Sequence, residues 1–314
     1  MKNTKGIFRG FTGVRANSKS LMDNSSFKEN TTGYLFLLPA LIVLGLFLFI
    51  PAMMSLYYSF TDYYMLTPDL TEFIALDNFK TLLSDATFRT SVGNIFQFVI
   101  FIMPIQVGTA LGLALLVNRS NRGTMFYKIA YFSPVVMSLV VVSVLWLYIL
   151  NPASGLLNEI LQTIGLPAQP FLSSPNQAMY VIIFVSAWQG AGYQMLIFLA
   201  GLQNIPEEVY EASTIDGANK WQQFLNVTLP MLKPTSLLIL TTTLIDAFKL
   251  IIQPMVMTQG GPLNSTLTPV YYIFRTGFTD RQIGFASALT VMYGGIIIIF
   301  TVLQRKFVGG DTNE

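Results

Sequence analysis

The sequence has no cysteine and no histidine among its 314 residues. Without them the chain cannot form disulfides, build the common zinc sites or use histidine for proton transfer. Charged residues are scarce at 11%, whereas soluble domains carry ~25%. Hydrophobic residues reach 53%, and the mean hydropathy is +0.56. This composition indicates a membrane protein and excludes catalysis that relies on thiolate, zinc or histidine.

Two larger patterns are also missing. The sequence contains no GxxxxGK[ST] phosphate loop, so any ATP hydrolysis has to be supplied by another polypeptide. It has no evident internal repeat, although many secondary transporters are built from two related halves. The net charge of +2 is spread over tails and short loops rather than gathered in a patch. We therefore expect no nucleic-acid partner, and no catalytic residue, metal ion or cofactor on this chain.

Six apolar runs each approach the ~20 residues that a helix needs to cross a bilayer. They cover Tyr34–Tyr58, Val92–Val117, Ile129–Leu150, Met179–Leu202, Ser236–Met255 and Phe285–Leu303. The predicted fold is an all-α membrane protein with six transmembrane helices over residues 34–307. Residues 1–33 are predicted to be a cytoplasmic N-terminal tail, either disordered or partly an amphipathic surface helix. Residues 308–314 are predicted to be a cytoplasmic C-terminal tail.

The positions of basic residues predict which side of the membrane each loop faces. The N-terminal tail, the loop after the second run and the C-terminal end are basic; in the last two the residues are Arg119, Arg122, Lys128, Arg305 and Lys306. Residues 59–91 instead hold five acidic residues against two basic ones. The last outer loop, with Arg275 and Arg281 against Asp280, fits this pattern less well. Both termini, and the segment between the fourth and fifth runs, are predicted to be cytoplasmic.

That segment, Ile205 to Pro234, is strongly polar. Its charged residues are Glu207, Glu208, Glu211, Asp216, Lys220 and Lys233. Each would cost ~2.5–3.5 kcal/mol at the centre of a bilayer, so the segment is predicted to lie in water. Pro206 suits a first helical position, and Gly217 suits a left-handed helix end. A second amphipathic stretch passes through Trp221, and Pro230 marks the return to the membrane.

The spacing in this segment resembles the EAA loop of binding-protein-dependent ABC importer permeases. Glu211-Ala212-Ser213 is followed after three residues by Gly217, and later by Val227 and Leu229-Pro230; Ser213 replaces the usual alanine. In that family the loop forms coupling helices that sit in a cleft on the cytoplasmic ATPase. The resemblance implies a coupling loop at about residues 205–230, with contacts from Glu211, Ala212, Ser213, Gly217, Leu229 and Pro230. The alternative is an ordinary amphipathic cytosolic loop.

Weaker motifs, in order and at family-like spacing, resemble the carbohydrate-type subgroup of these permeases. They are LxNF at residues 76–79 (with Ala75 in place of a glycine), GxxN at 155–158, AGLQ-x-IP at 200–206 and TxGGP at 258–262. The resemblance implies a carbohydrate solute, a second homologous permease subunit and an extracellular solute-binding protein. It also implies an ABC ATPase dimer that holds ATP and Mg²⁺, and a bacterial inner membrane whose lipid surrounds the chain.

Charged residues inside a membrane span are functional candidates. Asp246 and Lys249 lie three residues apart in the fifth run, on one predicted helical face, with Thr242 one turn earlier. They either line the translocation cavity or neutralise each other in a crevice between subunits. In relatives similar to the maltose transporter, sugar contacts fall on this helix and near the middle of the fourth span. This implies further pathway residues at Gln189, Gly190 and Tyr193, although neutral groups are expected at positions 246 and 249.

Polar residues of the second run, among them Asn94 and Gln106, are interpreted as interhelical hydrogen bonds. Three other functions stay open. The first is import of glycerol 3-phosphate, in which Lys249 would serve the phosphate. The second is an ion-coupled secondary carrier that works without an ATPase. The third is a membrane scaffold or receptor that transports nothing.

Overall fold

The computed structural model describes residues 34–118 and 124–308. The predicted N-terminal tail, residues 309–314 of the C-terminal tail, Arg119 and Arg122 lie outside the described residues. Within the described ranges the chain is built from helices, turns and loops. The β-structure of these ranges is one isolated antiparallel bridge between Thr61 and Phe73. The all-α prediction is confirmed.

The chain divides into two compact units between Met54 and Ser55. The first unit contains most of the apolar helix Tyr34–Tyr58, which includes the π-helical segment η1 (Gly45–Phe49) and continues into α2 (Ile50–Tyr58). The bounds of this helix are those predicted for the first span. Its 25 residues rise ~38 Å, which is enough to cross the ~30 Å hydrocarbon core of a bilayer.

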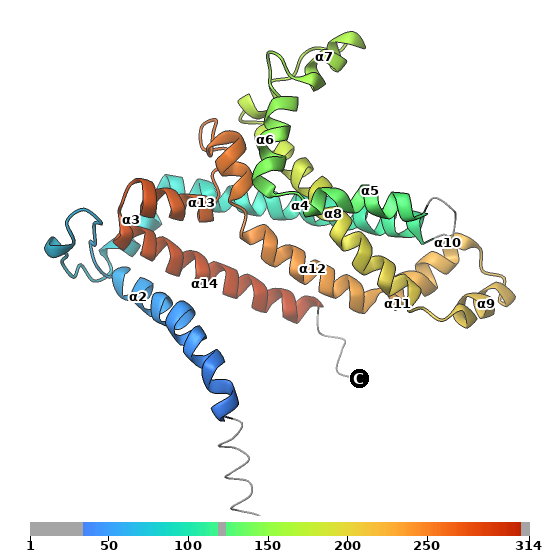
Figure 1. Ribbon diagram of the computed structural model, residues 1–314, viewed down its shortest axis with the longest axis horizontal. Helices are drawn as coiled ribbons and strands as arrows, with labels where there is room; N and C mark the ends of the chain where they lie inside the picture. Colours follow the sequence, from blue (N-terminus) through green and yellow to red (C-terminus); the bar gives the residue numbers. More distant parts are fainter. Residues whose placement is uncertain (1–33, 119–123, 309–314) are drawn as a thin grey trace, which may run out of the picture. The chain divides into compact units, whose positions relative to one another are not determined.

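Three long apolar helices frame the second unit. They are α4 (Ala86–Val117), α8 (Ala178–Gln203) and α14 (Ile283–Val308). α4 packs along α8, and α12 (Lys233–Phe248) contacts both of them (Figure 1). The small residues Ala110, Ala114 and Ala191 are buried in the cluster that α4 and α8 share. Small side chains at such positions let membrane helices approach each other closely.

The third predicted span is bent rather than straight. α5 (Thr124–Val136) and α6 (Leu139–Ile149) meet at 99°. Pro134, one turn before the bend, removes a backbone hydrogen bond and so weakens the helix there. A second bend of 65° separates Lys220–Met231 from Lys233–Phe248. The described residues therefore contain four long apolar helices, or six spans if each bent pair is one span.

The fifth predicted span, Ser236–Met255, is wrong as a continuous helix. α12 ends at Phe248, residues 249–251 are not helical, and the π-helical segment η5 (Pro254–Thr258) follows. Two side chains satisfy carbonyls exposed by the break: the Tyr293 hydroxyl donates to the carbonyl of Phe248, and the Thr268 hydroxyl to that of Leu250, both at 2.7 Å. Non-helical backbone at membrane depth is tolerated where the protein supplies such partners.

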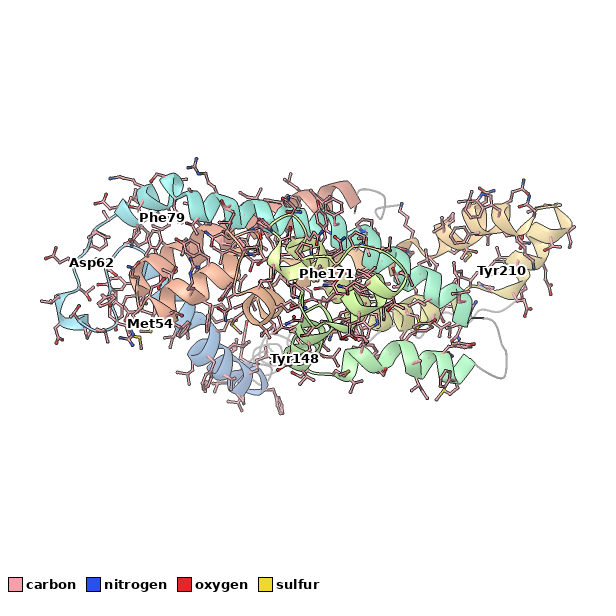
Figure 2. The ribbon with its side chains drawn as sticks, turned by 90° about the horizontal axis from the view of Figure 1, so that it is seen from above. Met54, Asp62, Phe79, Tyr148, Phe171 and Tyr210 are labelled. Atoms are coloured by element: carbon pink, nitrogen blue, oxygen red, sulfur yellow. The ribbon has the colours of Figure 1, made fainter. Side chains whose placement is uncertain are left out.

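Shorter elements connect the spans of the second unit. They are η2 (Pro68–Leu70), α3 (Asp77–Ser84), α7 (Leu156–Thr163), η3 (Phe171–Ser173), α9 (Glu207–Ile215), α10 (Lys220–Gln223), η4 (Phe224–Thr228), α11 (Leu229–Met231), α13 (Pro269–Phe274) and η6 (Arg275–Thr279). Figure 2 places Tyr210 of α9 at one end of this unit and Phe79 of α3 at the other. The helical hairpin of residues 205–230 and the loop with the LxNF motif thus lie at opposite ends.

Asparagine side chains hold the connecting loops together. Asn78 of the LxNF motif is buried, and its amide donates to the carbonyls of Ser59 and Thr61 at 3.1 and 2.8 Å. Asn94 donates to the carbonyls of Asn264 and Leu267 at 2.7 and 2.9 Å, in the loop after the TxGGP motif. The interpretation that Asn94 forms a hydrogen bond between two helices is therefore corrected. Asn94 joins α4 to a loop, whose carbonyls are not satisfied by the hydrogen bonds of a helix.

Ala75 has a left-handed backbone, with φ of +51°. This explains why the LxNF element of the family begins with a glycine, since a Cβ in this conformation costs roughly 1–2 kcal/mol.

We predict that Ala75→Gly stabilises the folded chain by up to about 1 kcal/mol, because glycine removes the left-handed strain but adds freedom to the unfolded chain. Ala75→Val should destabilise it, because a β-branched side chain tolerates positive φ least. Thermal unfolding of the detergent-purified protein checks both changes. Ala168→Gly, at a loop position without positive φ, is the control. A lower midpoint for Ala75→Gly than for the wild type would contradict the prediction.

Candidate functional site

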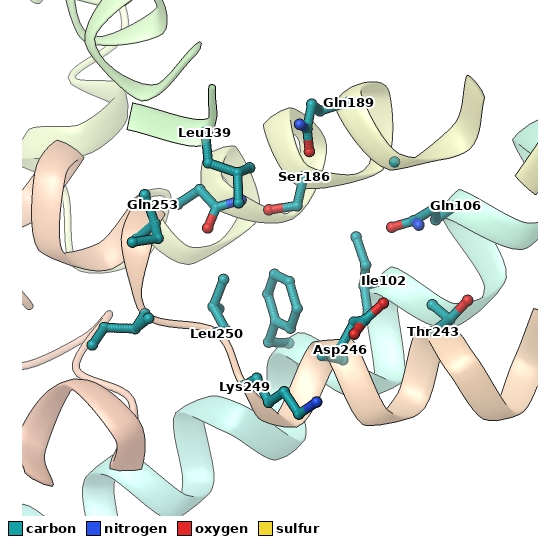
Figure 3. A pocket seen from close by; sticks show the side chains of 15 residues that line it. Ile102, Gln106, Leu139, Ser186, Gln189, Thr243, Asp246, Lys249, Leu250 and Gln253 are labelled. Atoms are coloured by element: carbon teal, nitrogen blue, oxygen red, sulfur yellow. The ribbon is translucent and has the colours of Figure 1, made fainter. Parts of the chain in front are cut away.

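A cavity of about 340 Å³ lies between α4, α8, α12 and the non-helical stretch after α12 (Figure 3). Its apolar side includes Phe98, Ile102 and Leu250. Its polar side chains are Gln106, Ser186, Gln189, Thr243, Asp246, Lys249 and Gln253. The cavity therefore presents amides, hydroxyls, one carboxylate and one ammonium group in an otherwise apolar helical body.

Four of the six predicted pathway residues line this cavity: Gln189, Gly190, Asp246 and Lys249. Tyr193 and Thr242 are exposed and do not line it. The Thr242 hydroxyl donates to the carbonyls of Leu238 and Ile239, at 2.9 and 3.1 Å. The solute contacts of all six residues remain predictions.

The register of α12 explains why Thr243 takes the place expected for Thr242. Thr243, Asp246 and Ala247 line the cavity, and this i, i+3, i+4 spacing marks one face of a helix. Position 242 is rotated away from that face by one residue, about 100°. Thr243 also accepts a hydrogen bond from the buried amide of Gln194 on α8. This bond fixes the cavity-facing side of α12 against α8.

The break in the fifth span decides where the two charged groups lie. Lys249 is the C-cap of α12, so Asp246 and Lys249 do not share a continuous helical face as predicted. Both side chains are exposed, and their charged atoms are more than 4.0 Å apart. Among the described residues the ion pair is Lys80–Asp77, at 2.7 Å. In the isolated subunit Asp246 and Lys249 therefore do not neutralise each other by direct contact.

Gln106 is a cavity residue that the sequence analysis interpreted as a helix–helix contact. Its amide occupies the space beside Gly190: a Cβ at position 190 would lie 2.4 Å from Gln106 Nε2. Gly190 thus makes room for Gln106, and Gln106 supplies the polar group. A polar residue inside a span is a functional candidate by default, and that signal could have identified Gln106.

Ser186 and Gln253 are further cavity residues that were missed. Both are buried, and the Ser186 Oγ has no hydrogen-bond partner within the described chain. Figure 3 shows the Ser186 hydroxyl and the Gln253 amide turned toward each other in the cavity. Gln253 lies beyond the break in the fifth span, so sequence periodicity alone could not place it beside α8.

The helical hairpin of residues 205–230 has the predicted form, with small shifts. α9 begins at Glu207, one residue later than predicted, because Pro206 is extended and forms its N-cap. Gly217 ends the helix with φ of +80°, as predicted, and the amide of Ala218 donates to the Ser213 carbonyl at 3.0 Å. The sequence analysis missed Asn219, which starts α10 through a capping box with Gln222.

Ser213 joins the two arms of the hairpin. Its hydroxyl accepts a hydrogen bond from Gln223 Nε2 at 3.0 Å, and the same nitrogen donates to the Thr214 hydroxyl at 2.8 Å. Tyr210 and Thr228 add a hydroxyl contact of 3.0 Å. The serine that replaces the usual alanine therefore contributes a hydrogen bond as well as small size.

The tip of the hairpin exposes apolar side chains beside charged ones. Ile215 is 86% exposed and Trp221 66% exposed, and Glu211 and Ala212 are also exposed. Leu229 is half-buried and Pro230 exposed in α11, where the chain turns back into α12. Large exposed apolar groups rimmed by polar residues are typical of interaction surfaces.

Comparison with known proteins identifies the class. Residues 108–309, which are 202 of the 314 residues, match the family described as binding-protein-dependent transport system inner membrane component. The chain belongs to this family, and the predicted resemblance is confirmed. It is an inner-membrane permease component of an ABC transport system.

Curated relatives and solved structures agree with this class. The chain is 34% identical to the probable ABC transporter permease protein YurN of Bacillus subtilis, over 87% of this chain and 94% of that protein. It is 34% identical to the sn-glycerol-3-phosphate transport system permease protein UgpA of Brucella abortus, over 91% and 98%. A chain of a bacterial alginate ABC transporter has the same fold, with a TM-score of 0.81 at 23% identity, covering 92% of this chain and 98% of that chain.

We predict that Gly190→Ala changes the Michaelis constant for solute uptake by roughly two- to tenfold. Gln106 has to move, and the hydrogen bond that we expect it to make to the solute, worth ~0.5–1.5 kcal/mol, is then lost. Gly108→Ala is the matched control: it also lies in a membrane helix, but its new Cβ would meet nothing within 4 Å. Uptake by vesicles with equal amounts of inserted protein provides the measurement. The same constant for Gly190→Ala and the wild type would refute a role for this contact.

Proposed function

We propose that the chain is the permease subunit of an ATP-driven importer for a carbohydrate, a di- or oligosaccharide. The observation that carries the proposal is the polar wall of the central cavity. Gln106, Gln189 and Gln253 each offer a donor and an acceptor, and Ser186 has an unpartnered hydroxyl. Sugar hydroxyls both donate and accept hydrogen bonds, so this wall suits them. Asp246 adds an acceptor at the mouth of the same cavity.

The partners follow from the family. The proposed assembly contains a second, homologous permease subunit, an ABC ATPase dimer and an extracellular solute-binding protein. ATP and Mg²⁺ are held by the ATPase, and this chain performs no hydrolysis. The basic loops support an orientation in which both termini and the helical hairpin are cytoplasmic. The polar residues 59–91 then face outward.

α12 is the proposed mechanical link between the hairpin and the cavity. The N-terminal half of α12 is anchored by packing. Its N-cap residue Leu232 and its residue Ile239 are fully buried in one cluster with Phe198 of α8. The C-terminal half of α12 carries Thr243 and Asp246, which line the cavity. ATPase closure would move α9, and α12 would transmit this motion to the cavity wall. The free energy that shifts the cavity between its two accessible states comes from the difference between the hairpin's contacts with the open ATPase and its contacts with the closed ATPase.

We predict that Gly217→Asp weakens retention of the ATPase without loss of membrane insertion, because a charged, strained residue is placed at the corner of the hairpin. Gly165→Asp is the matched control: its φ is +81°, against +80° at Gly217, and both sites are open. Glu211→Lys should act like Gly217→Asp, since it reverses a charge on the exposed face of α9. Co-purification of the ATPase with the tagged permease measures the effect. Unchanged retention in both hairpin variants would count against coupling.

Import of glycerol 3-phosphate is the second candidate. Lys249 faces the cavity without an ion pair to Asp246, and several curated relatives are glycerol-3-phosphate permeases. A free ammonium group in a cavity suits a phosphate.

Competition in the reconstituted complex separates the two cargoes. We expect oligosaccharides to compete for uptake and glycerol 3-phosphate not to compete. Lys249→Gln, which keeps hydrogen bonding but removes the charge, should change sugar uptake by less than about tenfold, as for loss of one hydrogen bond. Strong competition by glycerol 3-phosphate, together with loss of uptake in Lys249→Gln, would establish the second candidate instead.

A further inference from the structure

One buried side-chain amide differs from the others in what it bonds to. The buried amides of the described residues are those of Asn78, Asn94, Asn158, Gln194 and Gln253. The three asparagines donate to backbone carbonyls, and Gln194 donates to the Thr243 hydroxyl. Gln253 is only 6% exposed, yet its amide makes no hydrogen bond within the described chain. Buried polar groups are normally hydrogen-bonded, so this amide needs a partner from outside the protein.

The amide of Gln253 is open to the central cavity. Neither its oxygen nor its nitrogen is sealed from solvent, whereas the oxygen of the Gln194 amide is. Gln253 lines the cavity, and Figure 3 shows its amide turned into it. A molecule in the cavity can therefore reach both ends of this amide at once.

The break in the fifth span holds Gln253 in this position. The Tyr293 hydroxyl of α14 donates to the carbonyl of Phe248, and the hydroxyl of Thr268, the N-cap of α13, donates to that of Leu250, both at 2.7 Å. Gln253 follows three residues later as the N-cap of η5, and Pro254 after it is buried. The amide thus stands between anchored residues on both sides. A group fixed in its binding position loses little freedom when it binds.

An amide with two free ends suits a pair of neighbouring hydroxyls. Its oxygen accepts from one hydroxyl while its N–H donates to the other. Side-chain amides recognise an adjacent donor and acceptor on a base edge in the same two-bond way. The ring of a sugar presents such hydroxyl pairs. Asp246 and Lys249 line the same cavity but are exposed, so water satisfies them without a solute.

We propose that Gln253 binds two neighbouring hydroxyls of the solute, and that Tyr293 and Thr268 are positioning residues that hold it within reach. This inference rests on the proposed import function and names the part of the solute that the cavity recognises. A solute without the hydroxyl pair leaves the fixed amide buried and unpaired, and is therefore held more weakly. Gln253 is then a determinant of solute specificity.

The number of solute molecules imported per ATP hydrolysed by the reconstituted complex tests this role. The probes are labelled maltose, cellobiose and sucrose, with glycerol 3-phosphate alongside. Gln253→Met removes both ends of the amide but keeps an unbranched side chain of similar length. We expect it to lower the ratio roughly two- to tenfold, as for loss of one hydrogen bond, because weakly held solute escapes before the cavity opens inward. Loss of assembled complex would lower import and hydrolysis together and leave the ratio unchanged.

Gln162→Met is the matched control, because it makes the same change at an exposed glutamine of α7 that does not line the cavity. It should keep the wild-type ratio. If Gln253→Met fails to assemble, Gln253→Glu replaces it: this variant keeps the length and polarity but loses both N–H donors, and should also lower the ratio. An unchanged ratio in the Gln253 variant would overturn the proposal and leave water as the partner of the amide.

A double-variant cycle tests the two positioning residues. Tyr293→Phe should lower the ratio in the wild-type background but add no further loss in the Gln253→Met background, because Tyr293 acts through Gln253. Thr268→Val should behave in the same way, and Thr268→Ser, which keeps the hydroxyl, should restore the ratio. Fully additive losses would show that Tyr293 and Thr268 do not act through Gln253.

Monodeoxy analogues of the imported solute locate the hydroxyl pair. For the wild type the ratio should fall at two adjacent positions, and Gln253→Met should show no such fall. Loss of the same hydroxyls mattering equally in both proteins would contradict the assignment. The cargo is decided separately: import of glycerol 3-phosphate alone would overturn the carbohydrate function. Glycerol 3-phosphate also carries two neighbouring hydroxyls, so the Gln253 test is made with whichever probe the wild type imports.

Discussion

A helix that breaks inside a bilayer has to find partners for its freed backbone groups within the protein, because hydrocarbon offers none. In this chain that constraint is met at the end of α12. Tyr293 from α14 bonds the carbonyl of Phe248, and Thr268 bonds that of Leu250. The two bonds hold the non-helical stretch in place, and this stretch carries Lys249 and leads to Gln253 at the central cavity. The polar cavity therefore depends on hydrogen bonds from residues that do not line it.

Carbonyls of irregular segments that are buried by the protein itself also need partners, and three asparagines supply them. Asn78, Asn94 and Asn158 each donate to two backbone carbonyls of an irregular segment, where no helix satisfies them. An asparagine amide can do this because it carries two N–H groups on a short side chain. Asn78 of the LxNF motif, Asn158 of the GxxN motif and Asn94 of α4 therefore support loops, and Asn158 lies beside a second, apolar pocket at the start of α8.

In the proposed mechanism α12 is the central element, because it connects the helical hairpin to the cavity. At its N-terminal end the hairpin exposes Ile215 and Trp221 on a body tied together by Ser213 and Gln223. At its C-terminal end it presents Thr243 and Asp246 to the cavity. A helix anchored in a buried cluster moves as a rigid element, so a displacement proposed at the hairpin would reach the cavity with little loss. Coupling then needs no contact between the solute and the hairpin.

The sequence by itself determined the class, the number of apolar segments and the form of the hairpin. These follow from local properties: apolar runs of bilayer length, charges that cannot enter hydrocarbon, and Gly217 at a left-handed corner. Asp246 and Lys249 were found because charged groups inside apolar runs stand out, and Gln189 and Gly190 because the family resemblance implies solute contacts near the middle of the fourth span. Tertiary structure alone decided the rest. The break after Phe248, the choice of Thr243 over Thr242, and the approach of Gln106 to Gly190 depend on contacts between segments far apart in the chain. Helical periodicity fixes which residues share a face but not which face meets a neighbour, and only packing supplies that.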